Sequence, residues 1–223
     1  MKILLIRHGE PNYELDCLTE QGVQQAELLS RRMANLKIDE IYASPMGRAQ
    51  QTAKPTLEKL GMCAETLPWA HEFYYLAPDP KNPDASYQMW ETFPSCWAKD
   101  PEFFDATRWA SHPMIANSDI KALYDEVIEH LNQFLSKQGF VREGNTYRMT
   151  KKNDKTIVLF CHFGLATLVM SYLLGMSPFL LWQGASIDFT GISELFHEEY
   201  EDNLAVFKLN RFNDATHLHP EGQ

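Results

Sequence analysis

The sequence has few cysteines, no long apolar run and no excess of positive charge. Its four cysteines (Cys17, Cys63, Cys96 and Cys161) are scattered without a C-x-x-C pair, which argues against a zinc site and provides no disulfide framework. A reducing cytoplasm is the compartment expected for such a chain. No apolar stretch approaches the roughly 20 residues of a membrane helix, and charge appears too early at the N-terminus for a signal peptide. We therefore expect a cytoplasmic protein with no membrane partner.

Acidic residues outnumber basic ones, and the formal net charge is -10 at pH 7. This balance disfavours nucleic acid and anionic membranes as partners, because both carry the same sign of charge. A binding site for an anion would have to gather the few cations of the chain in one pocket.

Apolar periodicity predicts strands that alternate with helices along most of the chain. The run at residues 2–6 is continuously apolar, which is typical of a strand buried on both faces. Further strands are predicted near residues 41–43, 62–66, 156–161, 192–200 and 204–210, a hairpin at 140–149, and helices at 19–36, 44–61, 118–137 and from 162 to Gly175. Thr19 and Ser44 are the expected N-caps of the first two helices. The alternation predicts an α/β fold, a three-layer α/β/α sandwich with a mostly parallel central sheet and helices on both faces.

Residues 67–117 lack a regular pattern and are rich in proline and aromatic residues. So many large apolar rings are not expected in a disordered linker. We therefore predict a single domain, residues 1–223, with an inserted aromatic-rich helical cap at about 67–117. Tyr74, Tyr75 and Trp90 are candidates to line an entrance beneath this cap.

Unusual polar residues follow three of the predicted strands at the point where each strand ends. Arg7 and His8 follow the first strand, Ser44 to Arg48 follow the second, and His162 follows the strand that ends at Cys161. In an open parallel sheet, ligands bind at the carboxyl ends of the strands, where helix N-termini also bind anions. Two arginines and two histidines are therefore expected to converge on one anion.

The residues at these junctions resemble the motifs of the histidine phosphatase superfamily, which has the phosphoglycerate-mutase-like fold. The similar segments are Leu5-Ile6-Arg7-His8-Gly9-Glu10-Pro11, Leu18-Thr19-Glu20-Gln21-Gly22 with Gln25-Ala26, Ala43-Ser44-Pro45-Met46-Gly47-Arg48-Ala49 with Gln51-Thr52-Ala53, Val158-Leu159-Phe160-Cys161-His162-Phe163-Gly164, and the late stretch at 213–218. They span most of the chain in the order of the family.

The resemblance implies roles for four of these side chains. His8 matches the nucleophile that forms a phosphohistidine, which divides hydrolysis into two easier steps. Arg7, Arg48 and His162 match the phosphate pocket, and His162 also counts among the catalytic residues. Each cation about 4 Å from a phosphate charge contributes roughly 4 kcal/mol at an effective dielectric constant near 20, before desolvation. The resemblance implies neither a metal ion nor a cofactor.

The resemblance also implies an acidic residue after the third strand, where His71-Glu72-Phe73 stands. Glu72 is the preferred general acid, and it would later act on the attacking water. Other carboxylates stay open as alternatives at this point: Glu65, Glu91 and Glu10.

The sequence departs from the family pattern in two places. Many members have an asparagine seven residues after the first arginine, whereas this chain has Glu14 there and only Asn12 nearby. Asn12 is therefore the candidate fourth phosphate ligand, and Glu14 would repel phosphate unless it turned away. The loops associated with cofactor-dependent glycolytic mutases also have no match in this chain.

These features favour a metal-independent phosphomonoester hydrolase that acts on a small phosphorylated metabolite through His8. Two alternatives remain open: a phosphomutase of the phosphoglycerate mutase type, and a catalytically silent protein that binds phosphate or a partner. The expected partner is a small-molecule phosphate ester. The identity of the ester and the oligomeric state, monomer or homodimer, are open.

Overall fold

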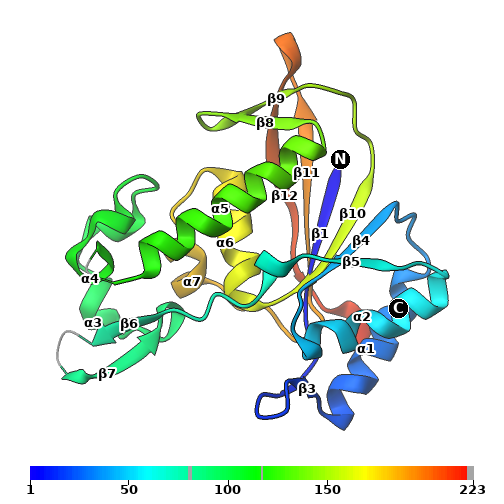
Figure 1. Ribbon diagram of the computed structural model, residues 1–223, viewed down its shortest axis with the longest axis horizontal. Helices are drawn as coiled ribbons and strands as arrows, with labels where there is room; N and C mark the ends of the chain where they lie inside the picture. Colours follow the sequence, from blue (N-terminus) through cyan, green and yellow to red (C-terminus); the bar gives the residue numbers. More distant parts are fainter. Residues whose placement is uncertain (80–81, 117, 220–223) are drawn as a thin grey trace.

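The computed structural model describes residues 1–79, 82–116 and 118–219, and its main feature is an eight-stranded sheet (Figure 1). The strand order is β5-β4-β10-β1-β11-β12-β9-β8. The strands are β1 (Lys2–Arg7), β4 (Glu40–Ala43), β5 (Ala64–Thr66), β8 (Phe140–Glu143), β9 (Thr146–Met149), β10 (Thr156–Cys161), β11 (Ile192–Glu199) and β12 (Leu204–Asp214). Strands β5, β4, β10 and β1 pair in parallel, and the other strands pair antiparallel.

The central strand β1 is buried on both faces because its side chains alternate between two hydrophobic clusters. Ile3 and Leu5 pack in one cluster, and Leu4 and Ile6 pack in the other. The apolar run at residues 2–6 therefore corresponds to a strand that is covered on both faces, as predicted.

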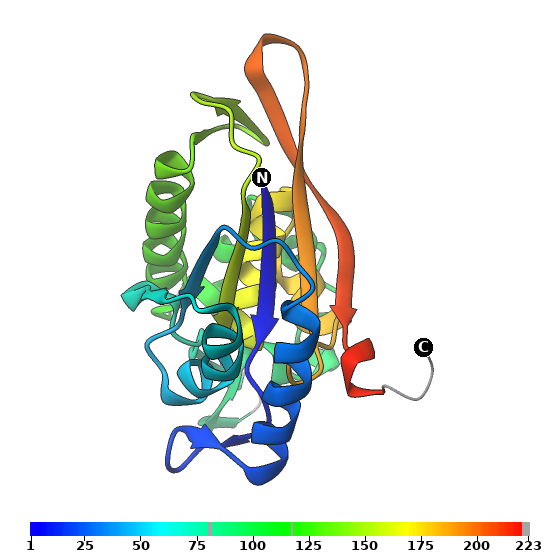
Figure 2. The same cartoon turned by 90° about the vertical axis from the view of Figure 1, so that its right-hand side faces the viewer.

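Helices cover both faces of the sheet (Figure 2). The helices α1 (Glu20–Met33) and α2 (Gly47–Leu60) pack on the face of Leu4 and Ile6. The helices α5 (Ile120–Lys137) and α6 (Phe163–Leu174) pack on the opposite face. The predicted fold class is thus confirmed. None of the helices in the described part of the chain combines the length and apolar character needed to cross a membrane.

The ends of α1 and α2 differ from the predicted helix ends in two places. Thr19 is the N-cap of α1 and accepts a hydrogen bond from the Gly22 N–H at 3.1 Å, as predicted. Helix α1 ends at Met33, before the predicted residue 36. The prediction that Ser44 caps α2 is wrong, because α2 begins at Gly47 with Met46 in the cap position.

The segment between β5 and α5, where an aromatic-rich helical cap was predicted, contains short helices and a pair of strands. Its elements are η1 (Pro68–Ala70), β6 (Leu76–Asp79), β7 (Asn82–Gln88), η2 (Met89–Glu91), α3 (Pro94–Trp97), η3 (Pro101–Phe104), η4 (Trp109–Ser111) and α4 (Pro113–Ala116). Phe103 and Trp109 are buried in the same cluster as the apolar side chains of α5 and α6. The β6–β7 hairpin and the helix α7 (Pro178–Gly184) were not predicted from the sequence. The short strands β2 (Pro11–Asn12) and β3 (Cys17–Leu18) pair with each other, and the turn η6 (Thr216–Leu218) follows β12.

Candidate active site

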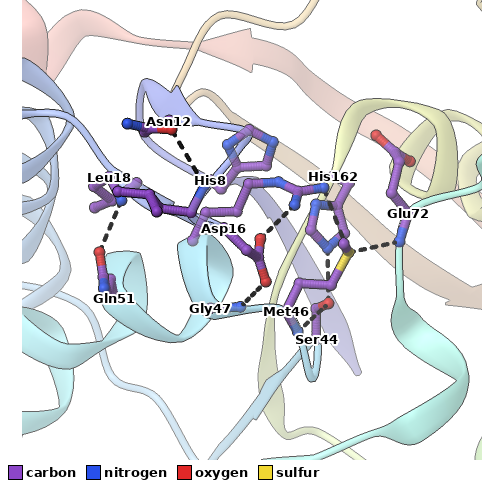
Figure 3. A network of polar contacts seen from close by, with 12 residues as sticks. His8, Asn12, Asp16, Leu18, Ser44, Met46, Gly47, Gln51, Glu72 and His162 are labelled. Atoms are coloured by element: carbon purple, nitrogen blue, oxygen red, sulfur yellow. Dashed lines mark hydrogen bonds and ion pairs between the residues drawn. The ribbon is translucent and has the colours of Figure 1, made fainter.

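The carboxyl ends of β1, β10 and β4 bring His8, His162 and Ser44 together. The registers pair Arg7 with Cys161 and Phe160 with Ala43, so the three residues that follow these strands are neighbours. The ring centroids of His8 and His162 are 5.2 Å apart. Residues far apart in the sequence therefore meet at one edge of the sheet (Figure 3).

The imidazole of His8 has a defined orientation and an unprotonated ring nitrogen. Its Nδ1 lies 2.7 Å from the Gly9 carbonyl oxygen, which only accepts hydrogen bonds, so Nδ1 carries the hydrogen. The lone pair is therefore on Nε2. The side chain is 1% exposed, and burial lowers the pKa of His8 to about 3, with Arg48 and Arg7 lowering it further. His8 is thus neutral at neutral pH, with Nε2 free to accept a bond.

His162 is fully buried beside His8 and is held by Ser44. Its Nε2 lies 2.7 Å from the Ser44 hydroxyl oxygen, and that oxygen accepts a hydrogen bond from the Met46 N–H at 3.2 Å (Figure 3). Burial lowers the pKa of His162 to about 2, and the nearby Arg48 adds to the effect. The serine that was expected to cap a helix therefore orients a histidine of the site.

Arg48 lies in the first turn of α2, with its guanidinium 1% exposed. Its Nη1 donates to Asp16 at 2.5 Å, and its Nη2 donates to the Tyr74 hydroxyl at 2.5 Å. Asp16 also accepts a hydrogen bond from the Gly47 N–H at 2.6 Å. The carboxylate thereby ties the β2–β3 loop to the start of α2 (Figure 3).

Arg7 is held by the segment that precedes β11. Its Nη1 donates to the Ile187 carbonyl, and its guanidinium lies 4.4 Å from the centre of the Phe189 ring. Burial lowers the pKa of Arg7, and nearby Glu72 opposes this effect. The sequence pattern gave no indication that the segment around Ile187 and Phe189 contributes to the site.

Glu72 follows η1, and its buried side chain lies against the first turn of α6. Its Oε1 accepts hydrogen bonds from the Phe73 N–H at 2.8 Å and the Leu165 N–H at 3.0 Å. The side chain is 6% exposed, and burial raises the pKa of this carboxyl despite these hydrogen bonds. Glu72 and Arg7 line the same cavity. A carboxyl group with a raised pKa beside an anion site suits a general acid.

The alternative carboxylates lie in different surroundings. Glu65 and Glu91 are exposed, and Glu10 accepts a hydrogen bond from the Thr19 hydroxyl at 2.8 Å. Asn12 Oδ1 accepts hydrogen bonds from the Glu14 N–H at 3.1 Å and the Leu15 N–H at 3.2 Å, so this oxygen holds the β2–β3 loop. The Glu14 side chain is exposed.

The candidate site contains several buried polar atoms without a protein partner. In the described residues these atoms are Arg7 Nε, Arg48 Nε, His162 Nδ1, Thr56 Oγ1, Gln88 Oε1 and His217 Nδ1. Half of them belong to residues that the sequence assigns to the phosphate pocket. Unpaired buried polar groups are costly in a folded protein, so these nitrogens are candidates to bind a ligand.

The backbone of Arg7 and His8 is held by further contacts that the sequence analysis did not predict. The Thr190 N–H donates to the Arg7 carbonyl at 3.0 Å and the His8 carbonyl at 3.2 Å. The Thr190 hydroxyl lies 2.9 Å from His217 Nε2. The late segment that resembles the family ending therefore supports the backbone of the site, a contact between distant parts of the chain that periodicity does not reveal.

The sequence matches the family model of the histidine phosphatase superfamily (branch 1) over residues 3–210. The chain belongs to this superfamily, as its motifs predicted. Among curated relatives, the probable phosphoglycerate mutase GpmB of Yersinia pestis is 35% identical over 81 residues, or 32% of this chain. The match spans only 38% of that relative's length.

Solved structures with similar folds match nearly the whole chain. A phosphoserine phosphatase variant from Entamoeba histolytica in complex with phosphoserine has a TM-score of 0.63 and 22% identity, covering 97% of this chain and 98% of its own. A mycobacterial glucosyl-3-phosphoglycerate phosphatase has a TM-score of 0.59 and 19% identity, covering 95% and 98%. At these identities the likeness shows the fold.

Proposed function

We propose that this protein is a metal-independent phosphomonoester hydrolase that acts on a small phosphorylated metabolite through a phosphohistidine on His8. The observation that carries the proposal is the meeting of a buried neutral His8 with unpaired nitrogens of Arg7, Arg48 and His162. Positioned positive charge and hydrogen-bond donors are the main source of catalysis in phosphoryl transfer.

In the first half-reaction, His8 Nε2 attacks phosphorus and the bond from phosphorus to the ester oxygen breaks. The arginines bind the phosphoryl oxygens. Donation from the Ser44 hydroxyl to His162 Nε2 leaves the His162 hydrogen on Nδ1, where it can donate to the same oxygens. Glu72 donates its proton to the leaving alkoxide, which departs as the alcohol.

In the second half-reaction, water replaces the alcohol. Glu72, now a carboxylate, accepts a proton from the water as its oxygen attacks phosphorus. The bond between phosphorus and His8 Nε2 breaks, and inorganic phosphate leaves. The enzyme then has its starting protonation state, so the cycle needs neither a metal ion nor a cofactor.

The test is hydrolysis of 4-nitrophenyl phosphate in the presence of EDTA. We expect the wild-type protein to release phosphate and His8→Ala to lose activity by about three orders of magnitude or more, the scale seen when a covalent nucleophile is removed. The control His219→Ala changes an exposed histidine in the same way and should retain activity. Turnover that requires added metal, or that survives in His8→Ala, contradicts the proposal. Tight phosphate binding without turnover would favour the silent binding protein.

A phosphomutase is the second candidate, favoured by the partial match to a probable phosphoglycerate mutase. A mutase shares the His8 chemistry but returns the phosphoryl group to the substrate before water reaches it. Incubation with phosphoglycerates separates the two, because isomer formation faster than phosphate release supports the mutase.

A further inference from the structure

A cavity of about 340 Å³ lies beside the candidate active site, between the end of β1, the cap and α7. Glu72 and Arg7 form its polar end, and its walls include Trp90, Phe163 and Trp182. Its volume is near the lower limit of small-molecule pockets, about 300–1,000 Å³. The cavity therefore suits the alcohol part of a small ester whose phosphate lies on His8.

Aromatic rings surround this cavity and both arginines. Trp90 and Phe163 meet edge to face, with centroids 5.5 Å apart and an interplanar angle of 81°. The Arg7 guanidinium lies 5.9 Å from the Phe163 ring, and Arg48 lies 5.4 Å from the Tyr13 ring. Aromatic walls of this kind bind planar rings by stacking and edge-to-face contacts.

The position of Trp90 depends on the glycine that follows Phe163. A Cβ atom added to Gly164 would lie 2.2 Å from Trp90 Cζ3 and 2.9 Å from Glu72 Oε1. Trp90 therefore packs directly on the first turn of α6, next to the candidate general acid. A ring in contact with Trp90 would lie close to the oxygen that Glu72 protonates.

The charges around the cavity oppose a second negative group on the substrate. Arg7 is the only cation among the described residues that line it, and this arginine is already assigned to the phosphate. Glu72 lies in the same lining, and Asp16 lies against the other arginine, Arg48. A carboxylate on the alcohol would be desolvated beside these groups without a cation of its own, which is unfavourable. Gln183 and Ser186 offer neutral polar contacts.

We propose that the natural substrate is the phosphate monoester of an uncharged alcohol that carries a planar ring, with the ring bound against Trp90 and Phe163. This inference rests on the phosphatase activity proposed above and specifies its substrate class. Phosphoserine and 3-phosphoglycerate carry an additional carboxylate, so they are poor substrates of this site.

The experiment compares benzyl phosphate, glycerol 3-phosphate, phosphoserine and 3-phosphoglycerate with the full chain. We expect kcat/KM for benzyl phosphate to exceed that for both carboxylate-bearing esters by about tenfold or more, within the range that pocket contacts can discriminate. Trp90→Leu should raise KM for benzyl phosphate about fivefold or more and change kcat/KM for glycerol 3-phosphate less than about twofold. Trp97→Leu is the matched control, because Trp97 packs in the cap against Phe104 and Phe179 outside the cavity lining.

The outcomes separate this inference from the proposed function. Turnover that depends on His8 but is faster with 3-phosphoglycerate or phosphoserine overturns the inference and leaves the phosphatase intact. An equal loss for benzyl and glycerol esters in Trp90→Leu also overturns it. If Trp90→Leu fails to fold, Phe163→Leu provides the same comparison. Absence of His8-dependent turnover with every ester contradicts the phosphatase itself, and the inference falls with it.

Discussion

His8 and His162 are both buried and lie side by side, yet their hydrogen-bond partners give them different chemistry. The Gly9 carbonyl fixes the hydrogen of His8 on Nδ1 and leaves Nε2 free to attack. The Ser44 hydroxyl occupies Nε2 of His162 and leaves its Nδ1 without a protein partner. These partners fit the proposed roles, His8 as the nucleophile and His162 as a donor to the phosphoryl group.

Glu72→Gln tests the assignment of the general acid. The amide keeps the shape of the side chain but cannot donate the proton, so hydrolysis of an alkyl ester should slow by about 10² to 10⁴. A 4-nitrophenyl ester should slow much less, because its leaving group departs without protonation. The kcat values of the two esters, measured in both proteins, provide the comparison.

The pH profile follows from the same two residues. Activity needs His8 neutral, so it should fall as the pH drops toward the pKa of about 3. Activity also needs Glu72 protonated in the first step, so it should fall again as the pH rises through the raised pKa of that carboxyl. Glu72→Gln should lose the alkaline limb. Equal slowing of both esters, with the alkaline limb retained, would contradict the role of Glu72.

The sequence could predict that Arg7, His8, Arg48 and His162 lie close together, because each lies at the end of a strand or the start of a helix. It could not assign Asp16 as the partner of Arg48 or Ser44 as the partner of His162. Those contacts depend on side-chain directions across elements, and periodicity contains no information about them. The role of Asn12 in phosphate binding remains a prediction.

At the scale of elements, three junctions build the site because parallel strands end at the same edge of the sheet. The strands β1, β4 and β10 are nearly continuous apolar runs, which made the sheet predictable. For the cap, the sequence could predict a folded segment but not the order of its helices and strands. The β6–β7 hairpin contains Asn82-Pro83-Asp84-Ala85-Ser86, a composition typical of turns and poor in strand-forming residues. Helix α7 is too short to show a helical period in the sequence, and its buried residues Phe179 and Trp182 hold it against the rest of the fold.

Gly164→Ala tests how the start of α6 positions Trp90 and Glu72. The added methyl group overlaps Trp90 Cζ3, so the indole has to move. We expect a loss of about 1–3 kcal/mol in the free energy of unfolding, typical of overpacking, together with a higher KM for benzyl phosphate. Urea unfolding and steady-state kinetics measure the two effects.

Gly184→Ala is the matched control, because its added Cβ meets no atom within 4 Å. It should change neither the urea midpoint nor KM. Unchanged stability and KM in Gly164→Ala would show that Trp90 does not pack against α6 as described.

For the whole molecule, buried neutral histidines link stability to pH. Burial lowers the folded pKa values of His8, His162 and His217 to about 3, 2 and 4. Between those values and the unfolded value of about 6.5, only the unfolded chain binds the protons. The free energy of unfolding should therefore fall as the pH is lowered through this range, by up to about 1.4 kcal/mol per histidine and pH unit.

Glu72 has the opposite sign, because its raised pKa lets the folded protein bind a proton before the unfolded chain does. Its contribution therefore opposes that of the histidines. We expect a lower urea midpoint at about pH 5.5 than at about pH 7.5. His8→Gln should reduce the difference, since it removes one titrating group. A midpoint independent of pH in the wild type would contradict the burial of neutral histidines.

The chain has a net charge of -10, so the fold has to bring cations from distant parts of the sequence together at the candidate site. Arg7 and Arg48 are held near His8 by segments that are distant in sequence. Two arginines gathered at one place in an acidic chain favour the anionic substrate that the proposed function requires.

The most direct test of the account is detection of a phosphoryl group on His8. The protein is mixed with 4-nitrophenyl phosphate, quenched in alkali and digested, and the peptides are analysed by mass spectrometry. We predict one phosphoryl group on the peptide that contains His8, stable in alkali, lost in acid and absent from His8→Ala. Turnover with no phosphoryl group on that peptide, or with one on another residue, would contradict the account.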